Sequence, residues 1–256
     1  MMPALFIGHG SPMNAIQDNA FTQTLTRIGL ELPRPRAIVC ISAHWTTRGT
    51  QVTSAKNPKM IYDMYGFPEE LYKIKYEAPG DEALAKEIHN QNKTSGMTLD
   101  DGTWGFDHGS WSVFKFLFPK ADIPILQMSI DLTQDSQYHF ELGQKLRQWR
   151  ESGVLIVGSG NIVHNLRNIS WKEDEKPFNW AVEFDEWFKT KLIDRDFSSI
   201  INDFAKTPEG QLSVPTLEHY LPVHYILGAA KSTDELKFEF EGMQNGSISM
   251  RAFKFG

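Results

Sequence analysis

The chain has 256 residues, of which 41% are hydrophobic and 23% charged, enough for the buried core of one large domain or two small ones. The formal net charge of −6 argues against a general nucleic-acid binder, because such proteins need a basic surface to displace counterions. Cys40 is the only cysteine, which excludes an internal disulfide and a cysteine-based zinc or iron–sulfur site. We expect it to be a small buried residue.

The N-terminal residues 1–8 lack the basic segment and the long apolar core of a signal peptide. No stretch of the sequence approaches the ~20 apolar residues that a membrane span requires. We therefore expect a cytoplasmic protein that binds neither membranes nor nucleic acid.

Apolar runs that predict buried strands alternate with segments of helical periodicity. The predicted strands are Ala4–Ile7, Ala37–Ser42, Ile123–Ile130 and Val154–Val157. The predicted helices are Glu82–Asn92, Ser110–Phe118, Asp135–Glu151 and Asn179–Leu192. This alternation indicates an α/β fold with a mostly parallel central sheet that is covered by helices on both faces.

The C-terminal end of the chain follows a two-residue period. Leu236–Glu241 and Ser247–Phe255 each alternate apolar and polar residues, and a glycine-containing segment separates them. This pattern predicts a C-terminal antiparallel hairpin at the edge of the sheet. No repeat, linker or low-complexity segment is present, so we expect a single catalytic domain over residues 1–256.

Two irregular stretches, Thr46–Pro79 and Ser170–Pro177, are long for connections in a compact domain. Such loops are often functional lids or pocket walls, and the alternative is surface decoration.

Two of the eight histidines follow predicted strands. His9 lies in Gly-His-Gly-Ser-Pro and His44 in Ser-Ala-His-Trp. Open α/β sheets bind their ligands beyond the carboxyl ends of the strands, so two such rings from neighbouring strands would converge. Imidazole is the commonest protein ligand of metals, and we therefore predict a metal site.

A third ligand must come from elsewhere in the chain. The best candidate is His219, in a segment stiffened by Pro215 and Pro222, although the adjacent Glu218 is an equally legitimate ligand type. His164 follows the glycine-rich Gly158–Gly160, where it could be a ligand or an acid–base group. That glycine-rich turn could also cradle a phosphate, but it lacks the P-loop lysine and the full dinucleotide pattern.

The remaining histidines have simpler interpretations. His108 is crowded by aromatic residues and glycines, which suits a pocket wall. His224 is expected to be a partly buried structural residue, and His89 and His139 lie in charged helical stretches and are expected to face solvent. The aromatic residues that we expect to line the pocket are Trp45, Phe106, Trp111 and Tyr220.

Five motifs in order, Gly-His-Gly-Ser-Pro, Ser-Ala-His-Trp, Gly-Phe-Asp-His-Gly-Ser-Trp, His-Asn-Leu and Glu-His-Tyr-Leu-Pro, resemble those of class III extradiol ring-cleaving dioxygenases. More narrowly, the chain resembles the 4,5-DOPA extradiol dioxygenase group over nearly its whole length. The resemblance implies a non-haem Fe(II) site whose ligands are His9, His44 and His219, with His164 as the acid–base residue and His108 as a second pocket histidine. Many relatives have a glutamate as the third ligand.

The substrates that this resemblance implies are a catechol such as DOPA and O₂. Zinc could occupy the same ligands, but it has no redox chemistry and would be inert as a dioxygenase. Two other functions fit the same residues: a zinc-dependent hydrolase with His164 as base, and a non-catalytic binding protein of the same fold.

Overall fold

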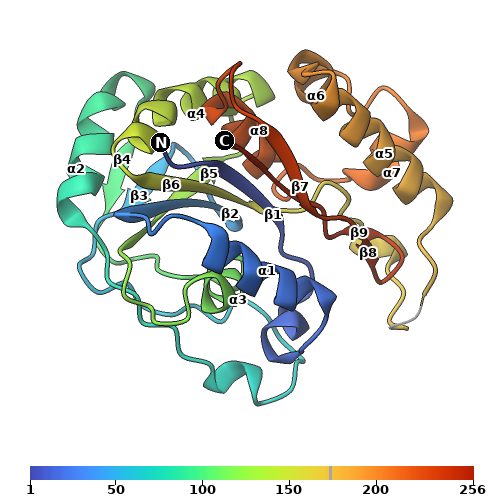
Figure 1. Cartoon of the computed structure of the whole chain (residues 1–256), viewed down its shortest axis with the longest axis horizontal. Helices are drawn as coiled ribbons and strands as arrows, with labels where there is room; N and C mark the ends of the chain where they lie inside the picture. Colours follow the sequence, from blue (N-terminus) through green and yellow to red (C-terminus); the bar gives the residue numbers. More distant parts are fainter. Residues whose placement is uncertain (173–174) are drawn as a thin grey trace.

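One large sheet organises the computed structural model, which describes residues 1–172 and 175–256. Among these residues, eight strands follow the order β4-β3-β5-β2-β6-β1-β10-β7 (Figure 1). Their bounds are β1 Ala4–Gly8, β2 Ala37–Thr47, β3 Gln51–Thr53, β4 Thr98–Asp100, β5 Ile125–Asp131, β6 Val154–Gly160, β7 Leu236–Phe240 and β10 Ala252–Phe255.

The centre of the sheet is parallel, as predicted. β1 pairs with β6, β6 with β2, and β2 with β5, all in parallel register, and every residue of β1, β5 and β6 is buried. All four predicted strands are present, and β2 and β6 extend beyond the predicted ends. β3 and β4 were not predicted, because strands of three residues are too short to show a period.

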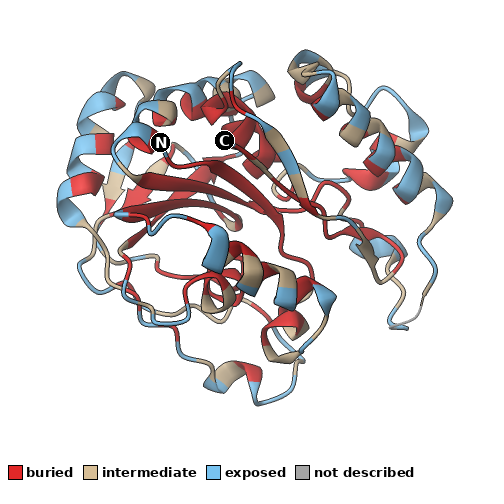
Figure 2. Cartoon of the chain, in the orientation of Figure 1, coloured by how far each residue is buried: buried red, intermediate tan, exposed pale blue. Residues whose placement is uncertain are grey.

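Helices cover both faces of the sheet, which confirms the predicted fold class (Figures 1 and 2). α1 and α3 pack on one face, while α2, α4, α5 and α8 pack on the other. The helix bounds are α1 Ala20–Glu31, α2 Glu82–Gln91, α3 His108–Leu117, α4 Ser136–Glu151, α5 Asn179–Ile193, α6 Phe197–Asn202, α7 Pro208–Ser213 and α8 Leu221–Ala229. Four of them, α1, α6, α7 and α8, were not predicted.

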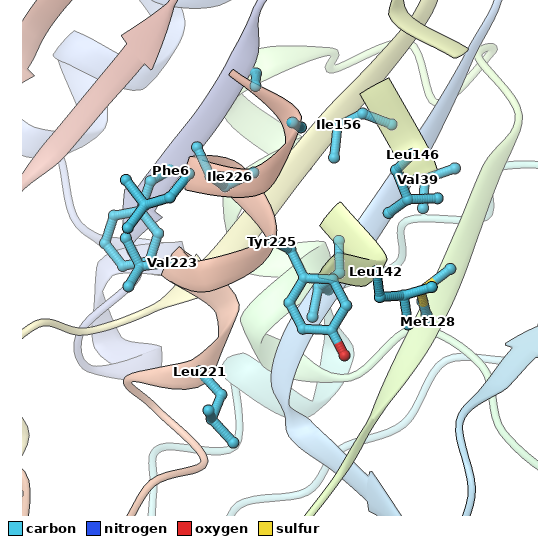
Figure 3. Close-up of a cluster of buried hydrophobic side chains, with 14 of the residues drawn as sticks. Phe6, Val39, Met128, Leu142, Leu146, Ile156, Leu221, Val223, Tyr225 and Ile226 are labelled. Carbon is cyan, nitrogen blue, oxygen red and sulfur yellow. The ribbon is translucent and has the colours of Figure 1, made fainter. Parts of the chain in front are cut away.

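α8 was not predicted because it is apolar on all sides and therefore has no amphipathic stripe. Every residue of α8 is buried. Figure 3 shows Val223 and Ile226 of α8 beside Phe6 of β1, with Leu142 and Leu146 of α4 nearby. This helix packs beside α4 on the same face of the sheet, and its first residue comes two positions after His219.

The C-terminal strands form the predicted antiparallel addition to the sheet edge. β10 pairs with both β1 and β7, and Ala4 lies opposite Phe255, so the two chain ends are side by side (Figure 1). The connection is wider than a simple hairpin turn. It contains β8 Met243–Gln244 and β9 Ile248–Ser249, which form a separate two-stranded sheet.

The structure differs from expectation for one of the outlying histidines. His139 is fully buried in α4, not solvent-facing, and its Nδ1 lies 2.9 Å from the hydroxyl of Tyr225. His89 is half-buried, and His224 is buried in α8 as expected of a structural residue. Cys40 is buried in β2.

The described residues include no helix long and apolar enough to span a membrane. The predicted loop Thr46–Pro79 contains β3 and the 3₁₀ helix η2, Leu71–Lys73. The other predicted loop, Ser170–Pro177, includes positions 173 and 174, which lie outside the described residues.

The buried histidines predict a loss of stability in acid. Burial lowers the pKa of His139 to about 4 and that of His224 to about 3, whereas the unfolded chain takes up these protons near pH 6.5. The stabilisation is therefore complete above about pH 6.5 and declines as the pH falls, by about 3 kcal/mol for His139 and about 5 kcal/mol for His224 once each ring is protonated in the folded state. We expect His224→Phe to flatten the dependence of the unfolding free energy on pH between about 4 and 6.5.

Neither ring nitrogen of His224 has a hydrogen-bond partner within the described residues, so the phenyl ring replaces it without breaking a bond. Urea titrations of the metal-free protein across this pH range measure the slope. An unchanged slope in the variant would show that His224 takes up its proton in the folded state.

Candidate metal and catalytic site

His9 and His44 lie at the edge of the sheet where its parallel strands end. His9 directly follows β1, and its N–H donates to the carbonyl of Gly160, the last residue of β6 (3.1 Å). His44 lies within β2 at an irregularity, where the pairing with β5 shifts register between Ile41 and Thr46. Such bulges re-aim side chains near active sites, and Nε2 of His44 here lies 3.1 Å from Nε2 of His9.

His108 is the first residue of α3, and Asp107 caps that helix. The carboxylate of Asp107 accepts hydrogen bonds from the N–H of Ser110 (3.2 Å), the hydroxyl of Ser42 (2.7 Å) and the amide of Gln127 (2.7 Å). Burial raises the pKa of Asp107 to about 6. This network attaches the start of α3 to β2 and β5, and so fixes the backbone of His108 relative to the sheet.

His219 and His164 approach the same edge from the other side. His219 lies in the turn before α8, and its carbonyl accepts a hydrogen bond from the N–H of Asn161 (2.8 Å). A Cβ on Gly160 would lie 2.2 Å from that carbonyl oxygen, so this close approach requires glycine. His164 follows β6, and its ring stacks on that of His219 with centroids 3.5 Å apart.

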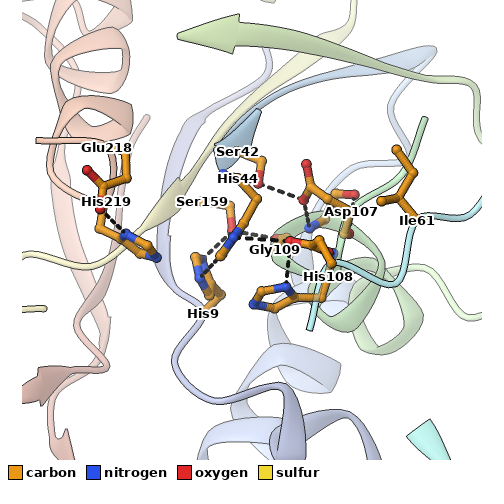
Figure 4. A network of polar contacts seen from close by, with 12 residues as sticks. His9, Ser42, His44, Ile61, Asp107, His108, Gly109, Ser159, Glu218 and His219 are labelled. Carbon is orange, nitrogen blue, oxygen red and sulfur yellow. Dashed lines mark hydrogen bonds and ion pairs between the residues drawn. The ribbon is translucent and has the colours of Figure 1, made fainter. Parts of the chain in front are cut away.

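The structure brings all five predicted site histidines together. The ring centroid of His44 lies 5.0 Å from that of His9, 3.9 Å from that of His108 and 5.0 Å from that of His219. His9 and His219 are 5.5 Å apart. Figure 4 shows these four rings facing a common space, with His108 and His219 on opposite sides of His9 and His44.

Ser159 determines which nitrogen of His9 is free. The Ser159 hydroxyl lies 2.5 Å from the carbonyl of Gly109, which can only accept, and 3.0 Å from Nδ1 of His9. The single hydroxyl proton therefore goes to Gly109, and Nδ1 of His9 must donate to Ser159. In the neutral ring, Nε2 of His9 keeps its lone pair and faces His44.

Asp63 faces the Nδ1 atoms of two further rings. Its Oδ2 lies 3.1 Å from Nδ1 of His44 and 2.9 Å from Nδ1 of His108. Burial alone would raise the pKa of Asp63, but the hydrogen bond from His108 and the two nearby imidazoles hold it at about 2. The ionised carboxylate only accepts, so Nδ1 of His108, which is hydrogen-bonded to it, carries a proton and Nε2 of His108 is free. The same negative charge, 3.1 Å from Nδ1 of His44, favours a proton on that nitrogen as well. The carboxylate of Glu218 lies 3.3 Å from Nδ1 of His219 and has the same effect.

The donor set fits a metal ion. Burial lowers the pKa of His9, His44 and His219 well below its ordinary value, so these rings are neutral at pH 7. Nε2 of His9 and Nε2 of His44 face one another, so a cation between them could bind both nitrogens. Their 3.1 Å separation matches two imidazole ligands of one ion, each at about 2.1 Å from it.

Among the described residues, two groups of three side chains could each hold a metal ion, and the ligand atoms within a group lie within 4.8 Å of one another. One consists of His9, His44 and His108, and the other of His164, Glu218 and His219. The ligand set predicted from sequence takes two residues from the first group and one from the second. The cluster can hold a metal, and the choice among these donors is part of the proposal below.

Two residues of this site were missed in the sequence. Ser159 belongs to Gly158–Gly160, which was considered as a phosphate cradle but is the hydrogen-bonded end of β6. Asp63 lies in the irregular stretch Thr46–Pro79, which has no periodic pattern that would single it out. The one available signal was the expectation that such a loop forms a pocket wall. Tyr220 was expected in the pocket wall, but it is buried against Phe204, and its hydroxyl donates to a core carbonyl.

Comparisons with known proteins agree with this geometry. Residues 3–250 match the family described as the catalytic LigB subunit of aromatic ring-opening dioxygenase. The chain is 45% identical over 258 residues to a protein of Escherichia coli named 4,5-DOPA dioxygenase extradiol, covering 100% of this chain and 95% of that protein. It is 34% identical to a protein of Beta vulgaris with the same name, covering 98% and 95%.

The fold is shared with a solved structure. The crystal structure of an uncharacterized protein from Escherichia coli K12 superposes with a TM-score of 0.88 at 42% sequence identity, covering 100% of both chains. The family match spans all five motifs that carry the site histidines. The chain therefore belongs to the LigB family of aromatic ring-opening dioxygenases.

Proposed function

We propose that this protein opens the aromatic ring of a catechol such as DOPA with O₂, beside rather than between its two hydroxyls. Divalent iron would be held by His9, His44 and His219. The single observation that carries the proposal is the convergence of five histidines at the strand ends in a member of a ring-opening dioxygenase family. The names of the relatives from Escherichia coli and Beta vulgaris support a catechol of the DOPA type as substrate.

The ligand set is supported by the arrangement of the rings. His219 and His108 lie on opposite sides of the pair His9 and His44 (Figure 4). His108 shares the Asp63 carboxylate with His44, while His219 has its own partner in Glu218. Coordination by His219 leaves His108 beside the metal, where its free Nε2 can accept a hydrogen bond from a bound catechol.

When bound, divalent iron would make the catechol hydroxyls more acidic and transfer electrons between the substrate and O₂. Neutral histidines suit this role because they leave the charge of the ion uncompensated. His164 would take a phenolic proton and return one later, since its ring nitrogens make no hydrogen bond to any other described side chain. Its ring stacks on that of His219, so it lies beside a proposed metal ligand but is not itself a proposed ligand.

Reconstitution with iron tests the function directly. We expect the protein loaded anaerobically with Fe(II) to consume O₂ when DOPA is added and to form a yellow ring-opened product. The zinc-loaded protein should consume none, because zinc has no redox chemistry. Ring opening that proceeds equally without O₂, or no reaction of the iron-loaded protein with any of a panel of catechols, would contradict the proposal.

The third ligand is tested by comparing two histidine variants. We expect His219→Ala to weaken Fe(II) binding by more than the roughly 10–100-fold typical of a residue that only orients a ligand. His108→Ala should retain the metal and lose activity. Metal content after gel filtration and competition with a chelator measure the metal affinity of both variants. If His108→Ala loses the metal and His219→Ala retains it, His108 is the third ligand.

His164→Ala tests the acid–base role. We expect this variant to bind iron with nearly unchanged affinity but to lose about 10²–10⁴-fold in kcat, the usual effect of removing a general acid–base group. Stopped-flow measurement of the product band gives kcat. Ring cleavage at the wild-type rate would remove His164 from the mechanism.

A further inference from the structure

One carboxylate restrains two histidines at this site. Oδ2 of Asp63 accepts from Nδ1 of His108 (2.9 Å) and lies 3.1 Å from Nδ1 of His44, and Oδ1 accepts from the backbone N–H of His108 (2.8 Å). The side chain of Asp63 is 16% exposed, so water competes little for these bonds. His44 is a proposed metal ligand and His108 is not, so the carboxylate links two different functions.

The position of Asp63 is fixed although it lies outside any helix or strand. Two residues earlier, the N–H of Ile61 donates to the carbonyl of Phe106 (2.7 Å), and the carbonyl of Ile61 accepts from Nε1 of Trp111 (3.0 Å). On the other side, Met64 is buried and its carbonyl accepts from the Tyr72 hydroxyl. The segment is thus attached to the start of α3, and Asp63 moves with His108.

We propose that Asp63 is a positioning residue that sets the affinity of the site for its metal through His44 and orients His108 toward the substrate. This inference rests on the proposed function, because it takes His44 as a metal ligand. An imidazole whose Nδ1 donates to a carboxylate is held in the tautomer that offers Nε2 to a metal, and the carboxylate also makes that nitrogen a stronger donor. Asp63 faces the Nδ1 atoms of two rings at once.

Asp63→Asn separates this role from a structural one. The amide oxygen can occupy the place of Oδ1 and keep the bond from the His108 backbone, so the start of α3 is preserved. The amide NH₂ then faces two Nδ1–H donors where an acceptor stood. At least one ring must change its tautomer or turn away, which withdraws an Nε2 lone pair from the site.

The experiment measures Zn²⁺ binding by competition with a chromogenic chelator, so it does not depend on turnover. We expect Asp63→Asn to weaken Zn²⁺ binding by about 10–100-fold. The Tm of the metal-free variant should stay within a few degrees of that of the unmutated protein. Asp63→Glu, which keeps the charge and both acceptors, should bind Zn²⁺ more tightly than Asp63→Asn.

Asp100→Asn is the matched control. Asp100 is also a buried carboxylate, but Oδ2 accepts from the backbone N–H groups of Gly102 and Trp104, and it contacts no histidine in the described structure. We expect this variant to bind Zn²⁺ as the unmutated protein does. Wild-type Zn²⁺ affinity in Asp63→Asn would overturn the proposal, as would a metal-free Asp63→Asn that is unfolded, because the residue would then be structural.

The two proposals fail in different ways. If the unmutated protein binds Zn²⁺ tightly, Asp63→Asn does not, and the iron-loaded enzyme opens no catechol, then the role of Asp63 stands and the proposed reaction is wrong. If the iron-loaded enzyme opens catechols and Asp63→Asn keeps full Zn²⁺ affinity, the reaction stands and the role of Asp63 is wrong.

Discussion

The site depends on one requirement, that the Nδ1 atoms of four imidazoles, those of His9, His44, His108 and His219, face an acceptor of the protein so that Nε2 keeps a lone pair. Ser159 accepts from His9, Asp63 accepts from His108, and Glu218 accepts from His219. The Asp63 carboxylate also lies 3.1 Å from Nδ1 of His44. Burial keeps the rings of His9, His44 and His219 neutral, and so preserves those lone pairs at pH 7. A cluster of neutral donors with fixed tautomers is prepared for a cation before the cation arrives.

The sheet supplies the positions from which these rings start. Parallel strands end at one edge, where His9 follows β1 and His44 lies in the irregular last part of β2, while Gly160 at the end of β6 lets the His219 turn approach closely. The all-buried α8 then anchors that turn in the core. Five segments distant in sequence thereby share one space, and the precision of the site comes from the rigidity of the sheet and core behind it.

The fold class and the histidines could be predicted from local sequence, because both depend on short-range patterns. Buried parallel strands are continuous apolar runs, and β1, β2, β5 and β6 show them clearly. His9 and His44 stand out because each follows such a run. α8 and the buried position of His139 were not accessible in this way, since their environment is set by α4 packing against α8 and not by a period in the sequence.

The sequence by itself determined which histidines could bind a metal, in what order they occur, and on which kind of element each lies. Only the tertiary structure decided which groups orient these histidines, because a hydrogen-bond acceptor must lie close in space, however far away it is in the sequence. Asp63 and Ser159 carry no local signal, and they lie 19 and 150 positions from His44 and His9. Their role arises from long-range packing that places one loop against α3 and one strand beside another.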